Sequence, residues 1–196
     1  MRQMRFCAGQ SVGLLGGSFD PPHSGHRTIS LAVLKALNLD FVWWLVNPQN
    51  PLKDHAPKNM AARLAACRAL TQHPKIYVSD EQTRFGTLYA IDMVRRLKAA
   101  HPTINFIWIM GADNLAELHR WKGWTDFMQE IPIVVYPRPN YTIQAMHSPA
   151  ALRYAHQRKK AFNARCFKFM PAPAWILLDG TLTLSQASSS ALRKPT

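Results

Sequence analysis

Short apolar runs alternate along this chain with segments in which apolar residues recur every three or four positions. The runs are typical of buried strands, and the spaced segments are typical of helices packed on a sheet. The runs predict strands at 11–15, 41–46, 76–79, 105–110, 131–136 and 174–178. The spaced segments predict helices at 28–37, 60–71, 88–100, 115–118, 124–130 and from 148 to about 162, with a helical turn at 188–193.

This alternation predicts the fold class. Strands separated by helices form βαβ units and a parallel sheet, and right-handed crossovers make that sheet doubly wound. We therefore expect a single-domain α/β fold with a Rossmann-like, mostly parallel sheet at 11–196. Residues 1–10 are expected to be a basic N-terminal extension that could be disordered, and the segment 47–58, rich in Pro and polar residues, is expected to be a loop.

The composition excludes several classes of protein. With 47% apolar residues and six Trp among 196 residues, the chain has enough apolar surface to form a core, which excludes a disordered protein. No apolar run approaches the roughly 20 residues of a membrane span, and no signal peptide is recognisable. Cys7, Cys67 and Cys166 lie far apart, which argues against a disulfide framework and a cysteine zinc site. The cytoplasm is the simplest compartment.

The charge is strongly positive, with 24 Lys and Arg against 11 Asp and Glu and a net charge of +13. No acidic residue occurs between Glu130 and Asp179. The basic residues of that window are Arg138, Arg153, Arg158, Lys159, Lys160, Arg165 and Lys168. Such a surface can attract nucleic acid or a phosphorylated small molecule, but it can equally be a solvated helix with no specific partner. No nucleic-acid-binding motif is present, which favours the solvated helix.

The segment 16–26, GGSFDPPHSGH, carries the candidate chemistry. Gly16 and Gly17 follow the first strand and allow a tight turn or a close backbone approach to a ligand. His23 and His26 are three residues apart at the start of a helix, so they share one side of it. The free N–H groups of a helix N-terminus favour phosphate. The segment therefore predicts a polyphosphate site whose histidines donate to oxygens that gain charge during phosphoryl or nucleotidyl transfer.

Other interpretations of these residues are simpler. A lone Gly-Gly pair is usually only a turn, and two histidines at this spacing can be surface residues or metal ligands. No third metal ligand is apparent in the sequence, which weakens the metal hypothesis. The combination of strand, Gly-Gly, two prolines, HxGH and helix is more specific than any of its parts.

The segment 16–26 resembles the (T/S)FDPxHxGH signature of the HxGH nucleotidyltransferase superfamily. Within it, the chain from Val12 to Arg193 resembles the bacterial nicotinate-nucleotide adenylyltransferases. The further stretches that carry the resemblance are the Pro-rich loop NPQNPLK at 47–53, Gly111-Ala112-Asp113, the segment around Trp121, Tyr136-Pro137-Arg138-Pro139 and Ser188-Ser189-Ser190-Ala191-Leu192-Arg193.

The resemblance implies an enzyme that joins ATP and nicotinate mononucleotide to give nicotinate adenine dinucleotide and pyrophosphate. The acceptor's own phosphate would attack the α-phosphorus of ATP, so no protein nucleophile is needed, and catalysis would be positioning plus charge stabilisation. The implied catalytic residues are His23, His26 and Lys53. Mg²⁺ would be held by ATP phosphates and water, with no ligand from protein side chains.

The resemblance also implies two sets of binding residues. The ATP set is Gly16, Gly17, Ser18, Phe19, His23, His26, Gly111, Asp113, Arg138, Ser189, Ser190 and Arg193. The nicotinate mononucleotide set is Ser18, Lys53, Thr87, Tyr89, Trp121 and Lys122, with the carboxylate of the ring expected to meet backbone N–H groups near Trp121 and Lys122.

Two of these residues have an alternative structural role. Asp113 could bind a ribose hydroxyl or a metal-bound water, or it could cap a helix that begins at Asn114. Trp121 could stack on the nicotinate ring or belong to the core.

The sequence departs from the family in three places. Leu88-Tyr89-Ala90 stands where the family often has Ser-Tyr-Thr, so Thr87 is expected to supply the missing hydroxyl. Lys122 stands where an aromatic residue is common. The chain ends at Thr196, where the family continues with a further helix or two, so we expect the turn at Arg193 to be poorly anchored.

Alternative functions remain open. A related nucleotidyltransferase could use nicotinamide mononucleotide or pantetheine phosphate as its acceptor. A nucleic-acid-binding module is the weaker alternative, because a basic balance is equally expected of an enzyme with two anionic substrates. The expected partners are ATP and nicotinate mononucleotide, without nucleic acid or membrane, and a homo-oligomer is compatible with the sequence.

Overall fold

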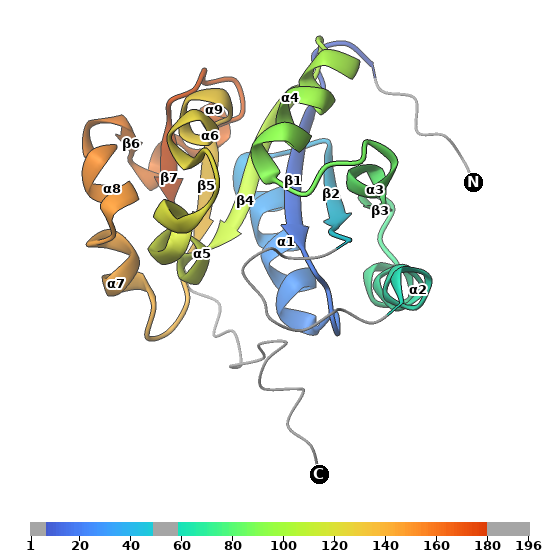
Figure 1. Cartoon of the computed structure of the whole chain (residues 1–196). Helices are drawn as coiled ribbons and strands as arrows, with labels where there is room; N and C mark the ends of the chain where they lie inside the picture. Colours follow the sequence, from blue (N-terminus) through green and yellow to red (C-terminus); the bar gives the residue numbers. More distant parts are fainter. Residues whose placement is uncertain (1–6, 49–58, 180–196) are drawn as a thin grey trace.

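The computed structural model describes residues 7–48 and 59–179, and within them one parallel sheet organises the chain (Figure 1). Its strands lie in the order β3-β2-β1-β4-β5-β7-β6, and every pairing is parallel. The strands are β1 Ser11–Gly17, β2 Phe41–Val46, β3 Ile76–Ser79, β4 Asn105–Gly111, β5 Ile133–Tyr136, β6 Arg158–Lys159 and β7 Trp175–Leu177. The predicted α/β, Rossmann-like fold class is confirmed.

Helices connect the strands. They are α1 Ser24–Leu37, α2 Met60–Thr71, α3 Glu81–Arg84, α4 Ala90–Ala100, α5 Ala112–Glu117, α6 Trp124–Glu130, α7 Thr142–Met146, α8 Pro149–Arg153 and α9 Ala164–Phe167. Three 3₁₀ turns lie at Leu118–Arg120, Ala155–Gln157 and Ala161–Asn163. No helix of the described ranges is long and apolar enough to cross a membrane.

The helices cover both faces of the sheet because side chains alternate along each strand. On β1, Val12 and Leu14 face one apolar cluster, which also holds buried residues of α4, α5, α6 and α8. Leu15 faces a second cluster, shared with α1, α2 and α9. Because the central strands are buried on both faces, their sequences are continuous apolar runs.

The order of the strands reverses at β1. The chain goes from β1 out to β2 and β3, and then returns to β4 on the other side of β1. In open α/β sheets a crevice forms outside the carboxyl ends of the strands at such a reversal, and ligands bind there. The residues that follow β1 and β4 therefore share one crevice.

Most predicted elements are confirmed. The bounds of β2, β3, α2 and α6 are those expected, and α1 begins four residues earlier than predicted, at Ser24. The short elements α3, α7, α9 and β6 were not predicted. The turn predicted at 188–193, most of the loop predicted at 47–58 and residues 1–6 of the predicted extension lie outside the described residues.

One predicted helix is wrong in length. The sequence predicted a helix from 148 to about 162, but α8 ends at Arg153. Its beginning is as expected, with Ser148 capping through a bond from the Ala151 N–H. The carbonyl of Tyr154 accepts a 2.7 Å bond from Nε1 of Trp175, and the chain continues through a 3₁₀ turn into β6. The same carbonyl also accepts from the N–H of Gln157 at 3.1 Å, so after α8 the chain forms a 3₁₀ turn that is held by a tertiary contact.

Candidate active site

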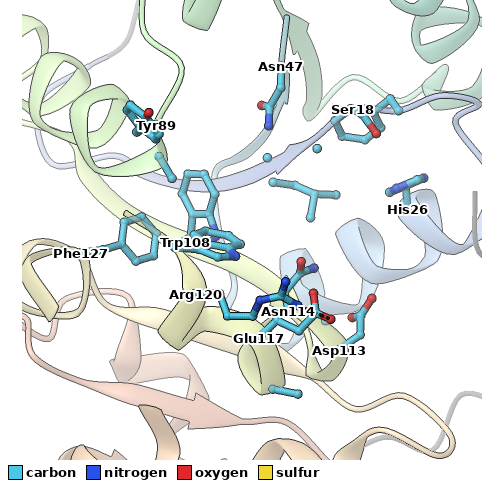
Figure 2. Close-up of a pocket in the computed structure, with 18 of the residues that line it drawn as sticks. Ser18, His26, Asn47, Tyr89, Trp108, Asp113, Asn114, Glu117, Arg120 and Phe127 are labelled. Atoms are coloured by element: carbon cyan, nitrogen blue, oxygen red, sulfur yellow. Dashed lines mark ion pairs between the residues drawn. The ribbon is translucent and has the colours of Figure 1, made fainter. Parts of the chain in front are cut away.

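A cavity of about 490 Å³ lies at the crevice outside β1 and β4. Figure 2 shows Ser18, Asn47 and His26 along one side of it and Asp113, Asn114 and Glu117 along the opposite side. Tyr89, Trp108 and Phe127 lie toward a third side, which is aromatic. The cavity is large enough for a nucleotide and combines polar and apolar walls, as small-molecule sites usually do.

His23 and His26 lie together at the N-terminus of α1. His23 is the N-cap residue, and the centroids of the two rings are 3.8 Å apart. The backbone N–H of His23 donates to Nδ1 of His26 at 3.2 Å. Because Nδ1 is an acceptor there, this bond assigns the ring proton of neutral His26 to Nε2. His26 therefore carries an N–H donor on the side of the ring away from its own helix cap.

A column of rings holds His26 in place. Phe19 stacks on Trp44 with centroids 4.8 Å apart, and the ring of His26 lies 4.7 Å from that of Phe19. Nε1 of Trp44 donates to Oγ of Ser30, which donates to the carbonyl of His26, both at 2.8 Å. Both the ring and the backbone of His26 are thus fixed. Phe19 is only 1% exposed, so its ring supports this column.

His23 is held neutral by its surroundings. The pKa of His23 is lowered from 6.5 to about 4, chiefly by burial and also by the positive charge of Arg138, while Asp113 opposes the change. Its Nδ1 atom is buried and has no hydrogen-bond partner among the described residues. A buried polar atom without a partner is costly, so this nitrogen is suited to a ligand that enters the pocket.

Asp113 and Arg138 form an ion pair on the opposite wall. Nη1 of Arg138 donates to Oδ2 of Asp113 at 3.0 Å, while Oδ1 of Asp113 is buried without a partner among the described residues. Thr142 fixes the backbone of Arg138, since its Oγ1 accepts from the Arg138 N–H and donates to the Arg138 carbonyl. The orientation of the pair leaves one carboxylate oxygen for another donor.

Gly111 is needed for this pair. A Cβ atom on Gly111 would collide with Oδ1 of Asp113 and lie 3.1 Å from Nε of Arg138. The structure also corrects one predicted role, because α5 begins at Ala112 and its N-cap is Gly111. Asp113 is the second residue of that helix, so the suggestion that it caps a helix beginning at Asn114 is wrong.

The two glycines after β1 have different neighbours. A Cβ on Gly16 would lie 2.7 Å from Cη2 of Trp108, so Gly16 makes room for an indole. The carbonyl of Gly17 accepts a 2.9 Å bond from the N–H of Asn47, which joins the ends of β1 and β2. The Gly-Gly pair therefore shapes the wall of the pocket as well as its turn.

Three of the residues expected to bind nicotinate mononucleotide, Tyr89, Trp121 and Lys122, line the aromatic side of the cavity. Nζ of Lys122 lies 4.2 Å from the centroid of the half-buried Tyr89 ring. Trp121 is half-buried, lines the cavity and also contacts Trp108 and Phe127, so its two suggested roles are compatible. Its backbone N–H donates to the carbonyl of Leu118 at 2.9 Å. This one N–H is therefore already bonded within the protein, and the expectation that backbone N–H groups near Trp121 and Lys122 meet the nicotinate carboxylate stays a prediction.

Thr87 was also expected to bind nicotinate mononucleotide, but it does not line the cavity. It is buried, and its hydroxyl is directed to the carbonyl of Gln82 at 3.5 Å and to Sδ of Met93 at 3.9 Å. The packing of α4 thus takes up the hydroxyl that was expected to replace the one missing after Tyr89.

The structure adds lining residues that the sequence analysis missed. The polar and aromatic ones among them are Asn47, Gln82, Trp108, Asn114, Glu117, Arg120, Phe127, Tyr141 and Gln144. Two had a usable signal, because Asn47 directly follows β2, beside β1, and Asn114 follows the Gly-x-Asp stretch. Lys53, Ser189, Ser190 and Arg193 lie outside the described residues.

Comparison with known proteins agrees with this geometry. Residues 14–194 match the sequence model of the cytidylyltransferase-like family. Two relatives, from Ruegeria sp. (strain TM1040) and Caulobacter sp. (strain K31), are both named probable nicotinate-nucleotide adenylyltransferase. The first is 45% identical over 94% of this chain and 96% of its own length, and the second 47% over 93% and 96%. The chain belongs to the nicotinate-nucleotide adenylyltransferases, within the cytidylyltransferase-like family.

A solved structure of a protein with lower sequence identity has the same fold. It is the nicotinic acid mononucleotide adenylyltransferase of Plasmodium falciparum, complexed with NaAD, at 18% identity and a TM-score of 0.72. The match covers 94% of this chain and 82% of that one. At this identity the likeness concerns the fold, and it agrees with the Rossmann-like sheet described above.

Proposed function

We propose that this enzyme transfers the adenylyl group of ATP to nicotinate mononucleotide, giving nicotinate adenine dinucleotide and pyrophosphate, a step in NAD biosynthesis. The observation that carries the proposal is the pair of histidine rings, 3.8 Å apart at the N-terminus of α1, which lines the same cavity as the Asp113–Arg138 ion pair. Figure 2 shows His26 and Asp113 on opposite sides of that cavity. The names of relatives at 45–47% identity support the choice of acceptor.

In the proposed reaction, a phosphate oxygen of the acceptor bonds to the α-phosphorus of ATP while the bond to the pyrophosphate oxygen breaks. Negative charge develops on the pyrophosphate that leaves. The Nε2–H of His26 and the N–H groups of Ser24 and Gly25, the first two residues of α1, would donate to these oxygens. His23 is neutral near pH 7 and would donate through the ring nitrogen that carries its proton.

The remaining ATP contacts are assigned by their positions. The backbone of the loop after β1 would approach the phosphates, at Gly16, Gly17, Ser18 and Phe19. Gly111 leaves space for the ion pair of Asp113 and Arg138. Oδ1 of Asp113 would accept from a ribose hydroxyl or a water, while Arg138 holds the carboxylate. Lys53, Ser189, Ser190 and Arg193 are proposed as phosphate contacts from the resemblance alone.

The acceptor would occupy the aromatic side of the cavity. Trp121 and Tyr89 present rings on which a pyridine ring can stack. Lys122 and Arg120, also in the lining, provide positive charge for its carboxylate. Ser18 lines the cavity on the same side as His26 and would contact the acceptor phosphate (Figure 2).

Mg²⁺ fits the residues at this site. No group of three or more His, Cys, Asp and Glu side chains suited to a metal occurs in residues 7–48 and 59–179, but Asp113 has one buried carboxylate oxygen without a described partner. Mg²⁺ in nucleotide sites usually keeps several waters and is held by substrate phosphates with one or two carboxylates. Bound Mg²⁺ would neutralise phosphate charge, and Asp113 would accept from one of its waters.

Pyrophosphate release with ATP and each of three acceptors tests the proposal. Nicotinate mononucleotide should give the highest kcat/KM, above nicotinamide mononucleotide and pantetheine phosphate. A higher kcat/KM with either of the other two would assign the chain a different acceptor. No turnover together with a salt-dependent gel shift would favour the nucleic-acid-binding alternative. We place the reaction in the cytoplasm, because the three free thiols suit a reducing compartment.

A further inference from the structure

Arg63 lies in the first turns of α2 and is only 3% exposed. Its guanidinium donates to three backbone carbonyls. Nη1 donates to the carbonyl of Ser18 at 2.6 Å and to that of Asn47 at 2.7 Å, and Nη2 donates to that of Pro48 at 3.3 Å. One buried cation thus joins α2, the loop after β1 and the residues after β2.

These bonds orient the phosphate side of the cavity. The carbonyl of Gly17 accepts from Asn47, and the carbonyl of Ser18 accepts from Arg63. Both peptide groups are trans, because the cis bonds among the described residues are at Pro21 and Pro173. In a trans peptide the N–H points opposite to the carbonyl. The N–H groups of Ser18 and Phe19 therefore point away from Asn47 and Arg63, and both residues line the cavity.

The backbone next to this bond is in an unfavourable conformation. Phe19 has φ = +46°, in the left-handed region that residues other than glycine rarely adopt. Such a conformation is unfavourable for a residue with a side chain and persists only where neighbouring contacts hold it. The stack with Trp44 holds the ring of Phe19, and the Arg63 bond holds the peptide that precedes it.

From these contacts we propose that Arg63 is a positioning residue for adenylyl transfer, and this inference rests on the proposed function. By holding the Ser18 carbonyl on the α2 side, Arg63 keeps that oxygen away from the anionic phosphates. It also directs the Ser18 and Phe19 N–H groups to them. When a mutation misplaces the reacting groups by about 1 Å, the rate can fall by about 10²-fold. The orientation of these N–H groups therefore affects the chemical step.

An arginine is specifically suited to the position. Its planar fork can donate to several carbonyls at once, whereas a lysine ammonium on a flexible stem cannot match that geometry. An apolar residue would avoid the cost of burying a charge but would leave carbonyls unpaired. The negative charge of Asp20 favours the charged guanidinium against the desolvation that lowers the pKa of Arg63.

Four variants of the full chain test the proposal. Arg63→Met keeps the stem and removes all three bonds, and Arg63→Lys keeps the charge. Leu64→Ala is the stability control, because Leu64 is the next residue of α2 and lies in the core beneath it. Arg68→Met is the control for charge, because Arg68 is exposed on the same helix. The readouts are kcat per folded molecule, ATP affinity by calorimetry and the melting temperature.

We expect Arg63→Met to lower kcat by about 30-fold or more and ATP affinity by about tenfold, with Arg63→Lys intermediate. Leu64→Ala should lower the melting temperature with kcat and ATP affinity unchanged, and Arg68→Met should change neither activity nor melting temperature. Equal kcat and ATP affinity in Arg63→Met and Leu64→Ala would overturn the proposal, and so would the failure of both Arg63 variants to fold. If the unmodified protein releases no pyrophosphate with any acceptor, the proposed function fails, and ATP affinity alone then decides the role of Arg63.

Discussion

The backbone N–H of His23 donates to the ring of His26, three residues further on, and this bond determines which nitrogen of His26 carries a proton. Asparagine at position 26 can place an amide oxygen near Nδ1 and keep this bond, but it has no donor where Nε2 lies. We therefore expect His26→Asn to lower kcat for pyrophosphate release by about 10²-fold, comparable to the loss of one oxyanion donor. His26→Gln, which reaches further, should retain more activity. Wild-type kcat in folded His26→Asn would refute the role of Nε2.

A double substitution tests the contact between Gly111 and Asp113. A Cβ at Gly111 would displace the Asp113 carboxylate, so Gly111→Ala should weaken ATP binding by about tenfold, as should Asp113→Ala. Because both changes act through the same carboxylate, adding Gly111→Ala to the Asp113→Ala protein should lower its ATP affinity little further. Isothermal titration of ATP into the four proteins measures the coupling. Additive losses would show that Gly111 acts on ATP directly.

The buried His23 should make stability depend on pH. Its pKa is lowered to about 4 in the folded protein, against 6.5 in an unfolded chain. Above pH 6.5 the ring is neutral in both states and contributes no pH dependence. Between pH 6.5 and 4 only the unfolded chain takes up the proton, so the free energy of unfolding falls, by on the order of 3 kcal/mol in total.

Urea unfolding across this pH range provides the measurement. His23→Gln should remove the fall in the free energy of unfolding between pH 6.5 and 4. The variant's free energy of unfolding should therefore change less with pH than that of the unmodified protein. His119→Gln, at an exposed histidine, is the control replacement. Identical slopes in the His23→Gln and unmodified proteins would contradict a buried neutral His23.

The choice between acid and amide acceptors should depend on side-chain charge. The Trp121 N–H is already bonded to Leu118, so the cations of that wall become the expected partners of the nicotinate carboxylate. We expect kcat/KM for the acid to exceed that for the amide by at least about tenfold, roughly 1.4 kcal/mol. Lys122→Met should reduce this ratio by lowering kcat/KM for the acid alone. Trp121→Ala should lower kcat/KM for both acceptors, because stacking does not depend on the substituent.

If Lys122→Met leaves the ratio unchanged, the carboxylate is recognised elsewhere, and Arg120→Met is the next variant to measure. Equal kcat/KM values for acid and amide in the unmodified protein would instead assign it to a dual-specificity class.

The three thiols should differ in reactivity. Cys7 and Cys166 are exposed, whereas Cys67 is fully buried, and burial raises the pKa of Cys67 to about 12. Because the thiolate is the reactive form, Ellman's reagent at pH 8 should titrate two thiols quickly and the third only after denaturation. In Cys67→Ser the slow thiol should be missing. Three fast thiols in the native protein would show that α2 opens readily from the sheet.

Sequence patterns among neighbouring residues were sufficient to predict much of the fold. Parallel strands buried on both faces produce continuous apolar runs, so β2 and β3 were predicted with the bounds that the structure shows. The spacing of His23 and His26 placed both rings on one side of α1, because that is a property of the helix itself. These relations depend on a few adjacent residues, and the sequence by itself determined them.

The tertiary structure decided the relations between distant residues. Arg63 bonds to Ser18, 45 positions earlier, and Asp113 pairs with Arg138, 25 positions later. The indole of Trp108 takes the space beside Gly16, Trp175 ends α8 at Arg153, and Met93 attracts the Thr87 hydroxyl. Each contact depends on the register of the strands and the packing of helices on the sheet. Periodicity states only which face of an element is buried, and not which residue of another element it meets there.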